Sequence, residues 1–368
     1  MTKNEKMERA YARDIAVTLL AIEKDGYIRE TGENIYQMTC PKCRDHALEV
    51  NAYIQMCKCQ CGLAGGIIDV IKAAYNVTAK EAADFLCKDF LDDTLLISHQ
   101  KDMILEMHKD AASFYFRRLK KGDKDARGAM KYLLEERKMS RETIRVAGLG
   151  YAGPKGTELY RYLKEKYPED AIKESGLIKF SERGAYDFFR NRIMFPIMDT
   201  QGKVIAFGGR VMDDTKPKYI NSPDTKIFAK SKILYGINRA FKSGKDYMLV
   251  CEGFMDTIAL HSAGYLNSIA SLGTALTEHH VFMIKKYVKT AYFLYDGDKP
   301  GINAALRGIE LANACGLEIK TVDLSQYKDP DEFIKQMGKE AFDKRLQQAI
   351  SSEDFVEKHK VQEENNEK

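Results

Sequence analysis

The spacing of apolar side chains changes along the chain and predicts where helices and strands lie. Residues 7–24 carry apolar side chains at helical spacing. Residues 35–62 consist of short extended runs, and helical spacing returns over residues 66–90. We therefore expect these three pieces to form one small N-terminal domain over residues 1–90.

The middle of the chain combines helices with strands. Residues 91–102 lose the apolar pattern and are typical of a linker, and residues 103–147 regain helical spacing. Short apolar runs at 192–198 and 203–207 predict strands. We expect residues 103–245 to form a mixed α+β subdomain.

From residue 246 onward, strand patterns and helical patterns alternate. Alternation of this kind is typical of a parallel sheet covered by helices, so residues 246–325 are predicted to form a parallel α/β core. Residues 326–368 are predicted to be a helical C-terminal segment with a polar, frayed tail from residue 361. The expected strands lie near residues 247–251, 267–271, 290–295 and 317–323.

Carboxylate side chains follow the apolar runs of this region. Glu252 comes directly after one run, Asp296 and Asp298 come after another, and Asp329 and Asp331 stand farther along. Because the C-terminal ends of parallel strands meet along one crevice, we expect these carboxylates to converge. Carboxylate oxygens without Cys or His suit Mg²⁺ or Mn²⁺, and the commonest work of such a site is phosphoryl chemistry on nucleotides.

These carboxylates also have a purely structural interpretation. Glu252 could cap the helix expected at residues 254–264, and Asp296 and Asp298 could belong to an Asp-Gly turn. Helix capping explains the Asp-Pro-Asp sequence at 329–331 nearly as well as metal binding does.

The bulk composition is that of an ordinary soluble protein, with 44% hydrophobic and 30% charged residues. No apolar run approaches the ~18 residues of a membrane helix, and the polar N-terminus argues against a signal peptide, so we expect a cytoplasmic protein without a membrane partner. The net charge of +4 does not by itself indicate a nucleic-acid partner. Three cysteines stand in apolar surroundings and are predicted to be core residues: Cys87, Cys251 and Cys315.

The other five of the eight cysteines lie between residues 40 and 61. In a cytoplasmic chain this clustering favours a metal over disulfides, and four thiolates suit a structural zinc ion. The ligands that we favour are Cys40, Cys43, Cys59 and Cys61. The irregular spacing of the second pair leaves Cys57 and His46 open as substitutes.

Residues 186–236 gather basic and polar side chains between the expected strands. Arg190 and Arg192 are two apart, so in a strand they would share one face. Three basic clusters in this stretch could line a groove for phosphates, although charge alone also fits a solvated surface. The carboxylates downstream favour nucleotide or nucleic-acid binding.

An ordered series of short motifs runs through the chain. The motifs are GLGYA at 148–152, FRNRIMFPI at 189–197, AFGGR at 206–210, PKYINSP at 217–223, LGTA at 272–275, YDGD at 295–298 and DPD at 329–331. With the N-terminal cysteines, this series resembles the bacterial replicative (DnaG-type) primases over nearly the whole chain. The resemblance implies an α/β multidomain fold with an N-terminal zinc ribbon, a mixed subdomain and a Toprim catalytic core.

The resemblance also implies roles for the matching residues. The residues that resemble the divalent-metal site are Glu252, Asp256, Asp296, Asp298, Asp329 and Asp331, of which Glu252, Asp296 and Asp298 would be catalytic. The residues that resemble positions holding nucleotide and template phosphates are Arg190, Arg192, Arg210, Lys218, Asn221 and Lys230.

The activity implied is that of a DNA primase, which makes short RNA primers on a single-stranded DNA template from ribonucleoside triphosphates. Two divalent ions, Mg²⁺ or Mn²⁺, would bridge the carboxylates and the incoming triphosphate. Zinc would be structural, and the zinc domain would contact the template.

Two features depart from the family pattern. Cys43 stands where the family usually has a histidine, and the sequence stops shortly after residue 360, where the family continues into a helicase-interacting domain. We therefore expect either a compact primase, as in a phage, plasmid or integrated element, or a truncated chain. A replicative helicase would then be a partner only by another route.

Two other classes of function share these features. A nuclease or topoisomerase could use the same Toprim carboxylates, although no motif singles out a nucleophilic tyrosine among the 20 present. A zinc-ribbon protein that only binds single strands is the second alternative, and the intact Glu252, Asp296 and Asp298 argue against it.

Overall fold

The protein, seen in a computed structural model, consists of two compact units, residues 1–100 and 101–368. The structure describes residues 15, 19, 27–32, 35–52, 54–75, 77–79, 81–83, 90–182, 184–295, 298–324 and 326–366. Among these residues, no helix is both long enough and apolar enough to cross a lipid bilayer.

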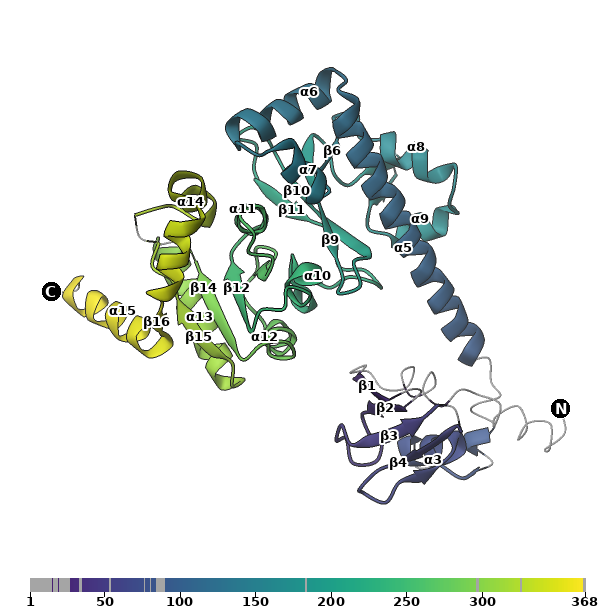
Figure 1. The fold of residues 1–368 in the computed structure, drawn as a ribbon. Helices are drawn as coiled ribbons and strands as arrows, with labels where there is room; N and C mark the ends of the chain where they lie inside the picture. Colours follow the sequence, from purple (N-terminus) through teal and green to yellow (C-terminus); the bar gives the residue numbers. More distant parts are fainter. Residues whose placement is uncertain are drawn as a thin grey trace. The chain divides into compact units, whose positions relative to one another are not determined.

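The first unit is an antiparallel sheet accompanied by helix α3 (Ile67–Tyr75) (Figure 1). Ile15 and Leu19, from the predicted N-terminal helix, are helical and fully buried in the same apolar core as Leu48 and Ile71. The strands neighbour one another in chain order: β1 (Ile28–Gly32), β2 (Ile35–Met38), β3 (Leu48–Asn51), β4 (Met56–Lys58) and β5 (Ala64–Gly65).

The segment expected to be a linker, residues 91–102, is helical. Helix α5 (Phe90–Lys121) includes it, and the division between the two units falls inside this helix, after Gln100. The polar side chains of this stretch obscure any apolar stripe. The stretch contains neither glycine nor proline, so nothing in its backbone opposes a helix.

Helices occupy residues 103–147, where helical spacing predicted them. After α5 come α6 (Lys124–Lys131), a π-helical turn η1 (Tyr132–Glu136) and α7 (Arg141–Val146). Side-chain caps start two of these helices, since Asp123 accepts the Ala126 N–H at 2.9 Å and Ser140 accepts the Thr143 N–H at 2.9 Å.

The mixed subdomain is built on a second antiparallel sheet. Both predicted strand runs are present, and every residue of β9 from Arg192 to Ile197 is buried, so this strand forms the centre of the sheet. The strands in spatial order are β11 (Tyr219–Asn221), β10 (Val204–Arg210), β9 (Arg192–Met198) and β6 (Gly150–Ala152). The remaining elements are α8 (Glu158–Lys164), α9 (Glu169–Glu174) and the hairpin of β7 (Ile178–Ser181) with β8 (Gly184–Asp187).

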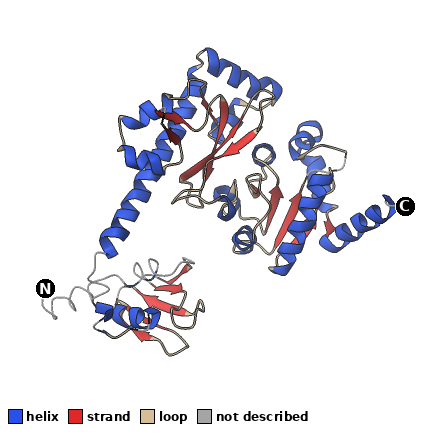
Figure 2. Ribbon diagram, turned by 180° about the vertical axis from the view of Figure 1, so that it is seen from behind, coloured by secondary structure: helices blue, strands red, loops and turns tan. Residues whose placement is uncertain are grey.

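The third sheet confirms the predicted parallel α/β pattern. In spatial order it contains β13 (Ser268–Ala270), β12 (Tyr247–Cys251), β14 (Thr290–Leu294), β15 (Glu318–Thr321) and β16 (Ile350–Ser351). The first four strands are parallel. The helices between them are α11 (Phe254–Ser262), α12 (Glu278–Lys285) and α13 (Lys299–Ala314), and Figure 2 shows them beside the strands.

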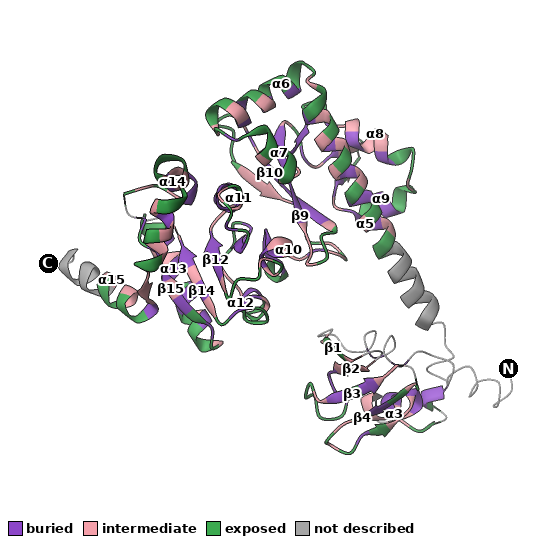
Figure 3. Cartoon of the chain, viewed as in Figure 1, coloured by how far each residue is buried: buried purple, intermediate pink, exposed green. Residues whose placement is uncertain are grey.

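The order of these strands reverses at one place. The chain runs from β12 outward to β13 and then returns to the other side of β12 to form β14. In open α/β sheets, ligands bind at the carboxyl ends of the strands where this reversal occurs. The topology therefore marks the carboxyl ends of β12 and β14, both largely buried in Figure 3, as the expected position of a site.

The C-terminal segment is helical, as predicted, and it also forms an edge strand that the apolar pattern did not predict. Helix α14 (Pro330–Gln347) leads to β16, which pairs antiparallel with β15, and α15 (Ser352–Asn366) follows. The tail expected to fray from residue 361 continues as helix to Asn366. Its Gln and Glu residues favour a helix, and it contains no glycine or proline.

The mixed subdomain and the parallel sheet share one apolar core, and Phe254 lies between them. Its ring stacks on Phe195 of β9, with centroids 5.0 Å apart and planes at 23°. It also covers Gly208 of β10, where an added Cβ would lie 2.4 Å from Phe254 Cζ. Gly208 is therefore required for this close approach.

Replacing Gly208 by alanine should destabilise the fold by about 1–3 kcal/mol, because the new methyl group overlaps the Phe254 ring. Urea unfolding measures the effect. Gly128→Ala in α6 is the matched control, since its added Cβ meets nothing within 4 Å. That change should stabilise the protein by about 0.5–1 kcal/mol. Equal stability of Gly208→Ala and wild type would show that the two sheets do not depend on this contact.

Candidate active site and cysteine cluster

Two of the predicted acidic residues follow the strands β12 and β14. Glu252 follows β12 directly, and Asp298 stands shortly after β14. These strands pair in parallel with Cys251 opposite Leu294, so the chain leaves both strands at the same edge of the sheet. Asp296 lies outside the described residues. The topology thus brings Glu252 and the segment that contains Asp298 to the reversal point of the sheet.

Electrostatic coupling indicates how close these groups lie. Tyr295, which follows β14, is half-buried; burial raises the pKa of its hydroxyl well above the usual value, and the negative charge of Glu252 raises it further. Asp256, in the first turn of α11, is 7% exposed. The carboxylates of Glu252 and Asp256 therefore lie about one helical turn apart, just after the end of β12.

Asp298 and Asp329 each cap a helix. The Asp298 side chain accepts the Gly301 N–H at 2.9 Å at the start of α13, and the Asp329 side chain accepts the Glu332 N–H at 2.8 Å at the start of α14. The capping interpretation of the Asp-Pro-Asp sequence is therefore correct for Asp329, whereas at Asp298, where the structural interpretation was an Asp-Gly turn, the structure has a helix cap. Each bond involves one carboxylate oxygen, so capping and metal binding are compatible at both residues.

Asp331 is 5% exposed and receives the Lys335 ammonium at 2.6 Å. Burial raises the pKa of Asp331, and the charge of Lys335 opposes that rise. The positive charge of Arg137, from the mixed subdomain, acts on Asp331 in the same direction as Lys335. Asp331 therefore stands where the two subdomains face each other.

A pair of arginines held by tyrosine hydroxyls occupies the mixed-subdomain side. Nε of Arg137 and Nε of Arg210 donate to the Tyr132 hydroxyl at 2.8 and 2.7 Å, and Arg210 also donates to the Tyr219 hydroxyl. Burial raises the pKa of Tyr219; Arg137 opposes this, and Asp256 adds to it. The arginine pair thus lies within electrostatic reach of the acidic residues. Sequence patterns did not identify Tyr132 or Arg137, and they assigned no role to Tyr219 within the PKYINSP motif.

Arg192 is a structural residue here. It is 7% exposed, and its guanidinium donates to three carbonyl oxygens, those of Gly209, Pro217 and Lys218, each at 3.1 Å. The expectation that Arg190 and Arg192 share one face is wrong, because Arg190 is exposed. Asn191 between them has φ 49°, which breaks the alternation of a strand.

The other predicted phosphate-binding residues come from separate elements. Arg190 lies over the Tyr186 ring at 5.3 Å, Lys218 is exposed just before β11, and Lys230 is half-buried in the 3₁₀ turn η2 (Lys230–Lys232). Asn221 ends β11, and its Nδ2 donates to the Leu272 carbonyl at 2.6 Å, which ties β11 to the loop after β13.

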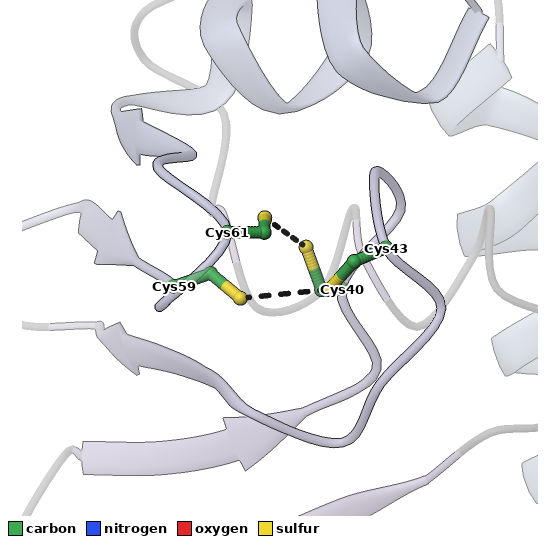
Figure 4. A group of neighbouring side chains, drawn as sticks. All are labelled: Cys40, Cys43, Cys59 and Cys61. Carbon is green, nitrogen blue, oxygen red and sulfur yellow. Dashed lines mark hydrogen bonds between the residues drawn. The ribbon is translucent and has the colours of Figure 1, made fainter.

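In the first unit, the side chains of the four favoured cysteines point toward one another (Figure 4). Their sulfur atoms all lie within 4.8 Å of one another. The Sγ atoms of Cys40 and Cys61 are 3.6 Å apart, and those of Cys43 and Cys59 are 3.7 Å apart. Four thiolates at about 2.3 Å from one tetrahedral zinc ion are about 3.8 Å apart, so this cluster fits zinc.

Tight turns present these cysteines. The backbone carbonyl of Cys40 accepts the Arg44 N–H at 2.8 Å, and Arg44 has φ 64°. Gly62, after the second cysteine pair, has φ 86°, and its N–H donates to the Cys59 carbonyl at 3.0 Å. The left-handed conformation closes each turn around a cysteine pair.

The two substitute ligands are engaged elsewhere. Cys57 is 4% exposed within β4 and belongs to the apolar core of the unit. The His46 ring stacks on Tyr27 at 4.0 Å, and its Nδ1 lies 2.9 Å from the Thr39 hydroxyl. Neither joins the four-cysteine cluster.

A cavity of about 330 Å³ lies at the far end of α11 from Glu252, between α7 and α10 (Ile237–Ala240). Arg239 and His261 line it. Burial lowers the pKa of His261 to about 4, so its ring is neutral at pH 7. The cavity contains none of the acidic site residues and is distinct from the site at β12 and β14.

Comparison with known proteins accounts for both parts of the second unit. Residues 114–241 match the N-terminal domain of the DNA primase catalytic core, and residues 249–334 match the Toprim-like family. The DNA primase of Clostridium acetobutylicum is 39% identical over 341 residues, which cover 89% of this chain and 56% of that protein. The chain thus spans little more than half the length of this curated relative.

Solved structures of primase domains are also similar to this chain. A DnaG primase catalytic domain bound to single-stranded DNA has a TM-score of 0.65 at 34% identity, over 71% of this chain and 83% of that one. The Aquifex aeolicus primase, in a structure of its zinc-binding and RNA polymerase domains, has a TM-score of 0.63 at 29% identity, over 94% of this chain and 85% of that one.

The fold and site define a Toprim protein with a second, antiparallel subdomain and a cysteine cluster. The chain belongs to the DnaG-type primase family, as the ordered motifs predicted.

Removing one cluster thiol should release the metal without unfolding the second unit. We expect Cys59→Ser to lose the roughly one zinc ion per chain that a four-thiolate site holds, because three ligands bind zinc far more weakly than four. Metal content by mass spectrometry measures this. Cys57→Ala is the control and should keep its zinc. Equal zinc in Cys59→Ser and wild type would remove Cys59 from the ligand set.

Replacing Arg192 should cost stability in a way that replacing Lys218 does not. Arg192→Met removes three hydrogen bonds to backbone carbonyls at a buried position, of which the Lys218 carbonyl keeps the Val211 N–H, and we expect this to cost about 3 kcal/mol in urea unfolding. Lys218→Met removes the same charge from an exposed position and should stay within about 0.5 kcal/mol of wild type. If the two variants unfold alike, Arg192 does not hold this loop.

Proposed function

We propose that this protein is a DNA primase that synthesises short RNA primers on single-stranded DNA by divalent-metal-dependent nucleotidyl transfer. One observation carries the proposal: Asp256 after β12 and Asp331 at the start of α14 lie within electrostatic reach of the arginine pair held by Tyr132, Asp331 acting on Arg137 and Asp256 on Tyr219. An acidic site beside a cationic one suits a metal-bound triphosphate, because the carboxylates take the ions and the guanidinium groups take the phosphate oxygens.

The proposed divalent-metal ligands are Glu252, Asp256, Asp296, Asp298, Asp329 and Asp331. Their donors are all carboxylate oxygens, which suit Mg²⁺ or Mn²⁺. The chemistry that bound divalent ions supply in nucleotidyl transfer is activation of the attacking hydroxyl and neutralisation of the leaving pyrophosphate. The helix caps at Asp298 and Asp329 orient these two carboxylates toward the ends of their helices.

The proposed binding residues for nucleotides and template are basic side chains of the mixed subdomain. Arg210 belongs to the pair beside the acidic site and is assigned to triphosphate oxygens. Arg190 and Lys218 are exposed and are assigned to template phosphates. Lys230 and Asn221 are assigned to the same role. Arg192 acts indirectly, because its hydrogen bonds shape the loop that presents Lys218.

The proposed substrates are a single-stranded DNA template and ribonucleoside triphosphates. The similarity to a primase catalytic domain bound to single-stranded DNA supports the template. The cysteine cluster is proposed to hold a structural zinc ion, and the zinc domain to contact the template, because a small zinc-stabilised sheet presents exposed side chains to DNA.

Primer synthesis on single-stranded DNA of mixed sequence, with labelled ribonucleotides and Mg²⁺ or Mn²⁺, tests the proposal. Wild type should make short labelled RNA. Glu252→Gln and Asp296→Asn should each lose at least about a hundredfold in rate, since each removes a ligand from ions worth several kcal/mol to the transition state.

Asp323→Asn is the matched control. Asp323 pairs with Lys358 on the surface at 3.4 Å and plays no part in the proposed site, so its variant should retain full activity. Release of nucleotides from DNA without ribonucleotide incorporation would favour a nuclease. Absence of any metal-dependent turnover, on varied templates and with both ions, would reject the enzymatic function.

A further inference from the structure

We propose that Tyr132 is a positioning residue for the incoming triphosphate: its hydroxyl fixes Arg137 and Arg210 as one phosphate-binding pair. The inference rests on the proposed function, and it adds Tyr132 and Arg137 to the residues on which nucleotide affinity depends. Neither residue carried a recognised motif in the sequence.

The hydroxyl of Tyr132 joins two guanidinium groups from distant parts of the sequence. Arg137 Nε donates to it at 2.8 Å and Arg210 Nε at 2.7 Å. Tyr132 is 6% exposed, so its ring is fixed by the surrounding core. Nε of each arginine is therefore hydrogen-bonded to the same oxygen, whose position the packed tyrosine ring sets.

The hydrogen bonds to the Tyr132 hydroxyl leave other guanidinium N–H groups of both arginines to bind a ligand. A guanidinium has five N–H donors. Within the described residues, Arg137 makes only the bond to Tyr132, and Arg210 makes one more, to Tyr219. Nε is occupied in both arginines, and Nη1 of Arg210 also donates to Tyr219. The groups that remain to receive an oxyanion are therefore the terminal nitrogens of Arg137 and Nη2 of Arg210, and guanidinium N–H groups match phosphate oxygens.

The π-helical turn explains how Arg137 reaches this position. The Arg137 N–H donates to the Tyr132 carbonyl at 2.9 Å, a bond from residue i+5 to residue i. In an α-helix, residues five apart are rotated by about 140° and point away from each other. A π turn brings them nearly over one another, and such turns are frequent at functional sites. Lys138 follows with φ 50° and ends the helix.

The charges around the pair favour an anion. Two guanidinium groups that share one oxygen repel each other, and Tyr132 contributes no charge to offset this. The negative charge of Asp331 acts on Arg137, but Lys335 already pairs with Asp331 at 2.6 Å. A triphosphate would supply the missing negative charge directly between the acidic site and the arginine pair.

Tyr132→Phe removes the shared acceptor and keeps the ring. We expect the KM for the incoming ribonucleotide to rise roughly tenfold, the effect of losing a hydrogen bond to a charged group, with kcat less affected. The affinity for inorganic tripolyphosphate, measured by titration calorimetry, should fall by a similar factor. The affinity for single-stranded DNA and the melting temperature should stay near wild type.

Tyr162→Phe is the matched control. The Tyr162 hydroxyl also accepts from two cations, Arg117 at 3.1 Å and Lys166 at 2.9 Å, but on the exposed surface of α5 and α8. This variant should leave KM and tripolyphosphate affinity unchanged. If Tyr132→Phe and Tyr162→Phe changed KM and tripolyphosphate affinity equally, the Tyr132 hydroxyl would have no specific role in positioning the arginines. That result would overturn the proposal.

Combining variants separates positioning from folding. In a protein with both Arg137→Ala and Arg210→Ala, adding Tyr132→Phe should have no further effect on tripolyphosphate affinity, because the hydroxyl acts only through the two arginines. A further loss would contradict the proposal. The calorimetric measurement requires no catalysis, so it tests Tyr132 even if wild type makes no primer, an outcome that would reject the proposed function instead.

Discussion

The parallel pairing of β12 with β14 is the constraint on which the rest of the second unit depends. It sends the chain out of the sheet at one edge, with Glu252 at the end of one strand and Asp298 shortly beyond the end of the other. A crossover connection is required between two parallel strands. Here the connection from β12 to β14 runs through α11, β13 and α12, and β13 pairs with the edge of β12 opposite to β14. The reversal of strand order that results is what opens a crevice at this edge. Acidic residues placed anywhere else on the sheet would not meet.

Concentrating negative charge at one edge is unfavourable unless opposite charge stands nearby. Two kinds of compensation are present. Lys335 neutralises the buried Asp331, and helix N-termini receive Asp298 and Asp329 through backbone N–H groups. Arg137 and Arg210 approach from the mixed subdomain but pair with tyrosine hydroxyls rather than with carboxylates. The arginines and the acidic residues therefore influence each other electrostatically without forming ion pairs, which is the arrangement that the proposed triphosphate site requires.

The sequence predicted those features that depend on local spacing. Apolar runs gave the four parallel strands, and cysteine spacing gave the four clustered thiols. It failed where a long-range contact decides the outcome. The spacing of Arg192 from Arg190 is the same whether Arg192 binds phosphate or supports the fold. Only its hydrogen bonds to the carbonyls of residues 209–218 make it a buried structural residue. The helix at 90–102 has no apolar stripe, and the π turn that places Arg137 over Tyr132 leaves no compositional signal.

Capping and metal binding are often treated as competing explanations of an acidic residue, but at Asp298 the two are compatible. The bond from Gly301 N–H holds one oxygen of Asp298 and leaves the second in a fixed direction. A metal ligand whose orientation is set by a hydrogen bond binds more strongly than a freely rotating one. The positive end of α13 also favours the ionised carboxylate, the form that binds metal. The residue types that begin a helix after a parallel strand are thus the same ones that can form a metal site, which explains why local sequence alone does not separate the two roles.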